Sequence, residues 1–187
     1  IALMHEKGEG VQKNFLEAVK HYELSLLHYS ESDKKKRLRS ESALNRIWNH
    51  SAITAAELDA IGAFYNSRNG GVERNPTKAF VWHKQAIKKD DTRGLSYRNF
   101  GVTYESEGKY ELAAKYYQLA IDRGYTEAQV DIDALLDRRN MSAKELNIIG
   151  NMYCEATNYL KAKLCYEKTI QKYPDSSMAY AKLSTFY

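Results

Sequence analysis

The histidines are the residues of this chain whose chemistry would most readily serve catalysis or metal binding. Zinc hydrolases place two histidines four residues apart on one helix, with a glutamate between them as general base. The five histidines here never have that spacing and are dispersed along the chain: His5, His21, His28, His50 and His83. A nucleophile elbow and a phosphate-binding loop are also missing from the sequence. We therefore predict a protein that is not an enzyme and has no metal site and no cofactor.

The two cysteines, Cys154 and Cys165, lie eleven residues apart and are expected on facing helices of one hairpin. A disulfide forms only where the two Cα atoms come within about 7 Å of each other. We favour two buried thiols, with a disulfide as the alternative.

The densest cluster of charge is the run of four cations at 34–37, followed by Arg39. Such a cluster can serve as a nuclear-import signal or as a polyanion-binding patch. Apolar residues between Leu38 and Trp48 supply one face of a helix here, so we favour a solvated helix surface. The net charge of +4 is too small to indicate a nucleic-acid partner by itself.

The composition is that of a folded, soluble chain, with 43% hydrophobic and 28% charged residues among 187. No apolar run approaches the roughly 20 residues that cross a bilayer, so we expect no membrane insertion in this segment. Both ends fall inside repeat patterns, and we expect them to lie within a longer protein. The sequence indicates no compartment.

A repeated pattern must position these side chains. A glycine is followed by a tyrosine after three residues, an alanine after twelve and a tyrosine after sixteen: Gly101, Tyr104, Ala113, Tyr117, then Gly150, Tyr153, Ala162, Tyr166. An earlier copy with a longer turn comprises Gly62, Tyr65, Ala79 and Trp82. A fixed period of this length predicts stacked helical hairpins, with small residues where the helices cross and aromatic side chains filling the wider gaps.

Periodicity and helix-start signals predict an all-α chain. We expect capping boxes at Thr54, Thr126 and Ser142, and a proline-initiated helix after Asn75. The predicted helices span 1–7, 14–29, 33–49, 54–68, 76–89, 93–107, 109–123, 126–138, 142–156, 158–172 and 176–187. The helices at 33–49 and 126–138 exceed the hairpin period. Because residues 54–62 recur at 142–150, we infer a duplicated unit of one single helix and two hairpins, with the stacking interrupted at both extra helices.

The intervals resemble those of the tetratricopeptide repeat (TPR), and two copies resemble its longer relative, the Sel-one-like repeat. The latter resemblance lies in the segment 7–11 followed by Ala18 and Tyr22, and in Asn69–Val72 followed by Ala79 and Trp82. It implies one repeat domain over 1–187, truncated at both ends, with a right-handed α-α superhelix. We assign 1–29 and 54–89 to Sel-one-like repeats, 93–123 and 142–174 to TPRs, 33–49 and 126–138 to extra helices, and 176–187 to the start of another repeat.

The resemblance also implies where a partner would bind. In this family the first helix of each hairpin lines a concave groove, which suits a peptide or a partner helix. The implied groove residues are Asp59, Asn66, Arg98, Val102, Glu105, Asn147, Asn151, Glu155 and Lys182.

The leading hypothesis is a non-catalytic scaffold or adaptor that binds a protein partner in this groove. One alternative is an RNA-binding helical repeat, but the predicted groove mixes three carboxylates with two cations, which argues against nucleic acid. The other alternative is a structural component of an envelope, secretion or polysaccharide-export assembly.

Overall fold

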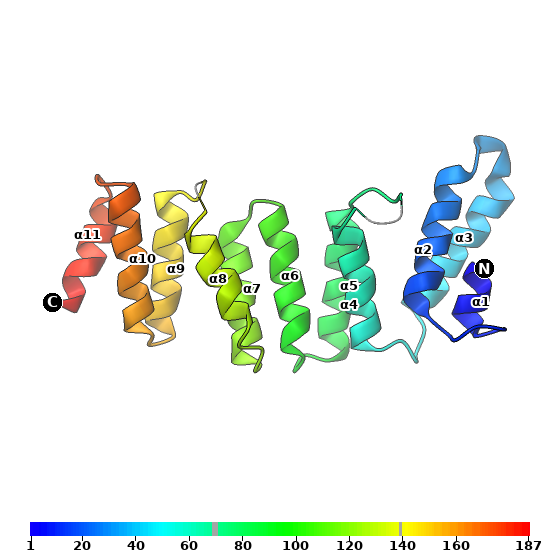
Figure 1. The fold of residues 1–187 in the computed structure, drawn as a ribbon, viewed down its shortest axis with the longest axis horizontal. Coiled ribbons are helices and arrows are strands. Elements are labelled where there is room, and N and C mark those ends of the chain that lie inside the picture. The colour runs from blue at the N-terminus through cyan, green and yellow to red at the C-terminus, as the bar shows by residue number, and fades with distance from the viewer. Residues whose placement is uncertain (69–70, 139) are drawn as a thin grey trace. The chain divides into compact units, whose positions relative to one another are not determined.

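The structure is a computed structural model that describes residues 1–68, 71–138 and 140–187. The described residues form eleven α-helices and two short 3-10 helices (Figure 1). The predicted all-α class is confirmed, because the helices pack as consecutive hairpins, consistent with an α-α superhelix. The chain divides into two compact units, Ile1–Thr92 and Arg93–Tyr187.

The first unit consists of two hairpins and one extra helix. Helices α1 and α2 form the first hairpin, α4 and α5 form the second, and α3 packs against α2, which also contacts α4. The helices are α1 (Ala2–Lys7), α2 (Phe15–His28), α3 (Lys34–Trp48), α4 (Ala55–Asn66) and α5 (Pro76–Lys89), with a 3-10 turn at Glu31–Asp33 before α3.

The second unit repeats this plan and adds a last short helix. Helices α6 and α7 pair, α9 and α10 pair, and the extra helix α8 packs against α7, which also contacts α9. The helices are α6 (Gly94–Ser106), α7 (Tyr110–Asp122), α8 (Ala128–Leu136), α9 (Ala143–Glu155), α10 (Tyr159–Lys172) and α11 (Ser177–Leu183), with a 3-10 turn at Ser184–Phe186. The two extra helices therefore lie where the excess length of the sequence predicted them.

Local capping explains where several of these helices begin. The capping boxes predicted at Thr54 and Ser142 are formed, each hydroxyl accepting from the backbone N–H three residues later at 3.2 Å. Asn75 accepts from the Lys78 N–H at 2.9 Å, and Pro76 follows at the first helical position. These side chains satisfy amides that have no partner within their helices.

The third predicted capping box, at Thr126, is not formed. Helix α8 begins at Ala128, and its N-cap residue Glu127 makes no side-chain cap. The side-chain amide of Gln129 was expected to complete the box. Its Nε2 instead donates to Asp133 at 2.8 Å and to the Tyr153 hydroxyl at 3.0 Å. A contact with the following hairpin thus replaces the local cap.

Aromatic and branched side chains fill the core of each unit. In the first unit the Trp48 and Trp82 rings meet edge-on at 4.8 Å between centroids, joining α3 to α5. In the second unit the fully buried side chains, at most 1% exposed, come from α8 and from both hairpins: Ile132, Leu135, Tyr117, Tyr153 and Tyr166. The aromatic residues of the repeat pattern are therefore mainly packing residues. Of the Asn69–Val72 segment, residues 69 and 70 lie outside the described part of the chain.

Candidate functional site

The repeat glycines lie where the two helices of a hairpin approach most closely. A Cβ atom at Gly101 would lie 2.7 Å from the Tyr117 ring, and one at Gly150 would lie 2.7 Å from the Tyr166 ring. The alanines of the pattern, Ala79, Ala113 and Ala162, are fully buried. Glycine at these positions therefore admits an aromatic ring from the second helix, and the small alanine beside it keeps the helices close.

In the α4–α5 hairpin the ring that faces the glycine belongs to His83. A Cβ atom at Gly62 would lie 2.6 Å from this ring, so His83, and not the predicted Trp82, is the equivalent of Tyr117. His83 stands four residues after Ala79, as Tyr117 stands four after Ala113. That spacing is the signal that would have identified it.

The position three residues before each glycine was predicted to face the groove, and the structure places it among partners within the chain. Asp59 is 3% exposed and pairs with Nδ1 of His83 at 3.1 Å. Arg98 makes two hydrogen bonds of 2.8 Å to the Asp131 carboxylate of α8, which raise the pKa of the guanidinium. Asn147 is 3% exposed, and its Oδ1 lacks a hydrogen-bond partner among the described residues.

Two of the other six predicted groove residues are also engaged by partners within their unit. Glu105 accepts hydrogen bonds from the Tyr117 hydroxyl and from Arg138, and Asn151 accepts from the Tyr166 hydroxyl at 2.7 Å.

The remaining four predicted groove residues differ in exposure. Asn66 is half-buried and accepts from Arg74 at 3.5 Å, and Val102 is half-buried. Glu155 and Lys182 are exposed. The predicted groove therefore offers few uncommitted polar groups.

A three-residue cluster fixes each extra helix to the hairpin before it. In the first unit Glu6 accepts from the Tyr22 hydroxyl at 2.7 Å and from Arg46 of α3 at 3.1 and 3.0 Å. Burial and this carboxylate raise the pKa of Tyr22. The second unit has the equivalent cluster in Glu105, Tyr117 and Arg138, which follows α8. The extra helices are thus attached by the same chemistry.

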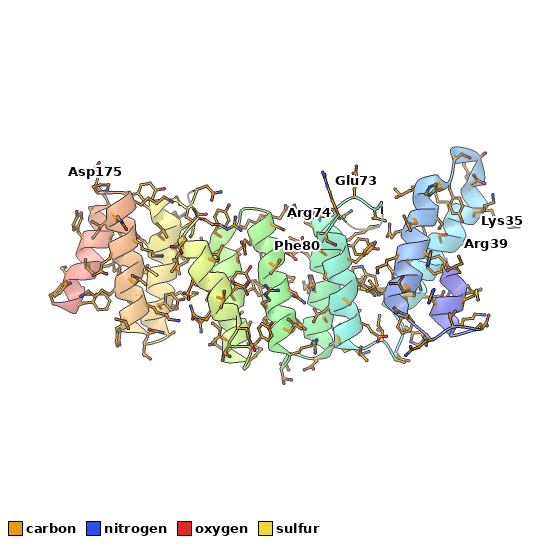
Figure 2. The ribbon with its side chains drawn as sticks, viewed as in Figure 1. Lys35, Arg39, Glu73, Arg74, Phe80 and Asp175 are labelled. Atoms are coloured by element: carbon orange, nitrogen blue, oxygen red, sulfur yellow. The ribbon has the colours of Figure 1, made fainter. Side chains whose placement is uncertain are left out.

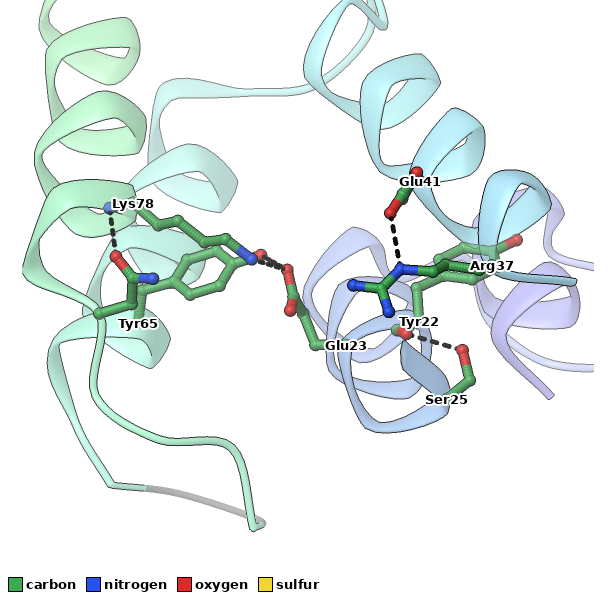
Figure 3. Close-up of polar contacts among 8 residues, drawn as sticks. Tyr22, Glu23, Ser25, Arg37, Glu41, Tyr65 and Lys78 are labelled. Atoms are coloured by element: carbon green, nitrogen blue, oxygen red, sulfur yellow. Dashed lines mark hydrogen bonds and ion pairs between the residues drawn. The ribbon is translucent and has the colours of Figure 1, made fainter. Parts of the chain in front are cut away.

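The tyrosine of the second hairpin is anchored differently in the two units. Tyr65 donates to the buried Glu23 of α2 at 2.5 Å, and Lys78 donates to the same carboxylate at 2.5 Å (Figure 3). Burial and the Glu23 charge raise the pKa of Tyr65. In the second unit Tyr153 instead meets Gln129 of α8, and burial raises its pKa to about 12. There the extra helix contributes directly to the anchor of the following hairpin.

An open cleft of about 650 Å³ lies between α8 and α10, with Tyr153 of α9 in its lining. We call it the α8–α10 cleft. Leu160 and Leu164 of α10 line it and are 80% and 47% exposed, respectively. Its other lining residues are charged side chains of both signs and one further leucine: Asp133, Leu136, Asp137, Lys161, Lys163, Glu167 and Lys168.

Sequence reasoning did not identify this cleft. The fully buried residues of α10 recur at Ala162, Cys165, Tyr166 and Thr169. Leu160 and Leu164 form a second apolar stripe, on the side of the helix opposite to that buried face. A helix with two apolar stripes is the signal that would have identified it.

Groups with catalytic potential are sparse in the described residues. No set of three or more histidine, cysteine, aspartate or glutamate side chains there could hold a metal ion. Both cysteines are free thiols, and burial raises the pKa of Cys165 to about 12. Within the described part of the chain, no helix has the length and apolar character needed to span a membrane.

Comparison with protein families finds the Sel1 repeat, which matches residues 1–27, 60–91 and 101–125. These segments cover most of the two regions predicted as Sel-one-like, 1–29 and 54–89, and most of 93–123, which had been assigned to a TPR. No curated protein matches the chain.

Proposed function

We propose that this chain, which carries repeats of the TPR-like Sel1 family at three positions, is a non-catalytic scaffold that binds another protein through the α8–α10 cleft. Repeats of this kind typically mediate protein interactions. The observation that carries the proposal is the exposure of Leu160 and Leu164 along one side of a cleft. Covering two leucine side chains removes apolar surface from water, at about 25 cal/mol per Å².

The occupant that fits the cleft best is an amphipathic helix or a short peptide with leucine-like anchor residues. Lysines and carboxylates are equally represented in the lining, and Lys168 of α10 already pairs with Asp137 beyond the end of α8. A balanced set of charges selects for orientation more than for strong electrostatic attraction. We therefore expect apolar contacts to supply most of the affinity and salt to have little effect.

A second contact with the same partner involves the exposed groove residues Glu155 and Lys182. The remaining groove residues, from Asp59 to Asn151, serve mainly to hold the repeats together. A role in an envelope, secretion or export assembly would use the same mode of binding with a different partner.

Site-specific photocrosslinking tests the proposal. A photoreactive phenylalanine analogue at position 164 is compared with the same analogue at position 130. Val130 is 71% exposed on α8 but does not line the cleft, so it is a matched control. When cross-linking is carried out in the native source, we expect a discrete protein adduct from position 164 and none from position 130.

The captured partner is then purified and its binding to the intact chain is measured. Adducts of the same protein at both positions, or no loss of affinity after Leu164→Asp, would contradict a cleft-directed interaction. RNA in place of protein at position 164 would support the RNA-binding alternative instead.

A further inference from the structure

The helix α3 concentrates positive charge more than any other described element. Its fifteen residues contain six lysines and arginines and one glutamate, whereas the whole chain has a net charge of +4. The excess on this one helix is therefore larger than that of the entire chain. Charge of this density on one helix repels itself unless something neutralises it.

Part of this charge is neutralised within the unit. Lys36 pairs with Asp33 at 2.8 Å, Arg37 with Glu41 at 3.2 Å, and Arg46 with Glu6 at 3.0 Å (the Arg37–Glu41 pair is drawn in Figure 3). Lys35 and Arg39 lie exposed on α3 (Figure 2). Neither has an ion-pair partner among the described side chains. These two cations stand one helical turn apart.

The unpaired cations line an open pocket that is separate from the α8–α10 cleft. This pocket, of about 700 Å³, is formed by α1, α2 and α3, and we call it the basic pocket. None of the described residues that line it is acidic. The lining comprises Leu3, Tyr22, Tyr29, Lys35, Lys36, Leu38, Arg39, Ser40, Ser42, Ala43 and Arg46.

We propose that the basic pocket binds an acidic, extended segment of a partner protein, with its carboxylates on Lys35 and Arg39. Four residues of helix rise about 6 Å, so the two cations are about 6 Å apart along α3. Side chains on one face of an extended peptide repeat every two residues, at about 6.6 Å. Acidic residues at alternate positions would therefore match the two cations.

Apolar side chains at the edge of the pocket favour a peptide over a nucleic acid. Leu38 is 64% exposed and Leu3 is 43% exposed, and both line the pocket. A peptide can cover these leucines with an apolar side chain placed between its carboxylates. A sugar–phosphate backbone has no such group, and the Tyr22 hydroxyl is already bonded to Glu6.

A defined peptide tests the proposal with the full chain. The probe is a fluorescein-labelled 12-residue peptide with glutamate at alternate positions and leucine or serine between them. The control peptide has glutamine in place of each glutamate. Binding is measured by fluorescence anisotropy at about 0.05 M and 0.2 M salt, because exposed ion pairs weaken as the Debye length shortens.

Two charge-reversal variants provide matched controls. Lys35→Glu with Arg39→Glu changes the pocket, whereas Lys84→Glu with Lys88→Glu makes the same change at the same spacing on α5 of the same unit. All four side chains are exposed, so the fold should remain intact, with changes in stability of about 0.5 kcal/mol or less.

We expect the pocket variant to lose at least roughly tenfold in affinity and the α5 variant less than about twofold. Equal losses in both variants, or equal binding of the glutamine peptide, would overturn the proposal. Binding of a 12-residue uridine oligonucleotide as tight as that of the acidic peptide would also overturn it, in favour of nucleic acid.

Discussion

The two units follow one plan, a hairpin, an extra helix and a second hairpin, but they use the extra helix differently. In the second unit α8 is short, its only charged residues are acidic, and its buried residues form part of the core. Arg98 pairs with its Asp131, and Arg138 and Asp137 beyond its end pair with Glu105 and Lys168. In the first unit α3 is longer, strongly basic and tied to the preceding hairpin through Arg46.

This difference determines which surface each unit leaves for a partner. In the second unit most of the charges near α8 form ion pairs that attach this helix, and the accessible feature is a cleft with two exposed leucines. In the first unit the cluster around Glu6 fixes α3, and cations at the other end of the helix remain exposed. The same architecture therefore presents an apolar site in one unit and a cationic site in the other.

The largest expected effect concerns one repeat position in the two units. The His83 ring is only 1% exposed, and replacing Asp59 with alanine removes the carboxylate that pairs with it. We expect this change to lower the free energy of unfolding by about 3 kcal/mol. Replacing the equivalent Asn147 should lower the free energy of unfolding by only about 1 kcal/mol, because its buried Oδ1 has no partner among the described residues and its Nδ2 makes one long hydrogen bond, 3.4 Å to Ser176. Urea unfolding of both variants measures the difference, and equal losses would refute it.

A smaller effect tests the shared attachment of the extra helices. Glu6→Gln and Glu105→Gln each remove the charge of a carboxylate that accepts hydrogen bonds from a tyrosine hydroxyl and from an arginine. The arginines are about half exposed, so we expect a loss of roughly 1–2 kcal/mol in each unit. Thermal unfolding checks this. A loss in only one variant would mean that the clusters are not equivalent.

A third prediction concerns the turns within the α6–α7 and α9–α10 hairpins. Gly108 and Thr157 occupy equivalent positions with φ of 70° and 57°, and their N–H groups donate to equivalent partners, the carbonyls of Glu105 and Cys154. A β-branched residue is strained in this left-handed region. Thr157→Gly should stabilise the second unit by about 1 kcal/mol, whereas Gly108→Thr should destabilise it similarly. A lower melting temperature for Thr157→Gly would contradict the equivalence.

The smallest effect is chemical. Because burial raises the pKa of Cys165 from its ordinary value near 9 to about 12, it should resist alkylation at pH 8, whereas the half-buried Cys154 should react. The raised pKa also means that Cys165 contributes stability below pH 9 that is lost as the pH rises toward 12.

Mass spectrometry after iodoacetamide treatment should find one modified thiol in the native protein and two in denaturant. The Cys154→Ser variant is the control, and rapid native modification of that variant would contradict burial of Cys165.

The sequence predicted the helices well because helix periodicity, capping and proline are local signals. Both extra helices were predicted to within a few residues, and the boxes at Thr54 and Ser142 formed as expected. The box at Thr126 did not form, since Gln129 meets Tyr153, a residue 24 positions away. Local propensity could not anticipate a competitor supplied by tertiary packing.

The candidate site was harder to predict for the same reason. The groove stripe was assigned from repeat position alone, which does not show that Arg98 meets Asp131 of an inserted helix. The α8–α10 cleft depends on the space left between two helices that are distant in sequence. Only its apolar stripe, Leu160 and Leu164, was visible beforehand.

The most direct test of the α8–α10 cleft as a protein-binding site is the affinity of the photocaptured partner for two variants, Leu160→Asp and Val130→Asp. Both replace an apolar side chain that is more than two thirds exposed with a carboxylate, but only Leu160 lines the cleft. We predict that Leu160→Asp weakens binding at least about thirtyfold, as expected for an interface hot spot, with little salt dependence, and that Val130→Asp changes it less than about twofold. Equal affinities of the two variants would contradict the assignment of the cleft as the protein-binding site.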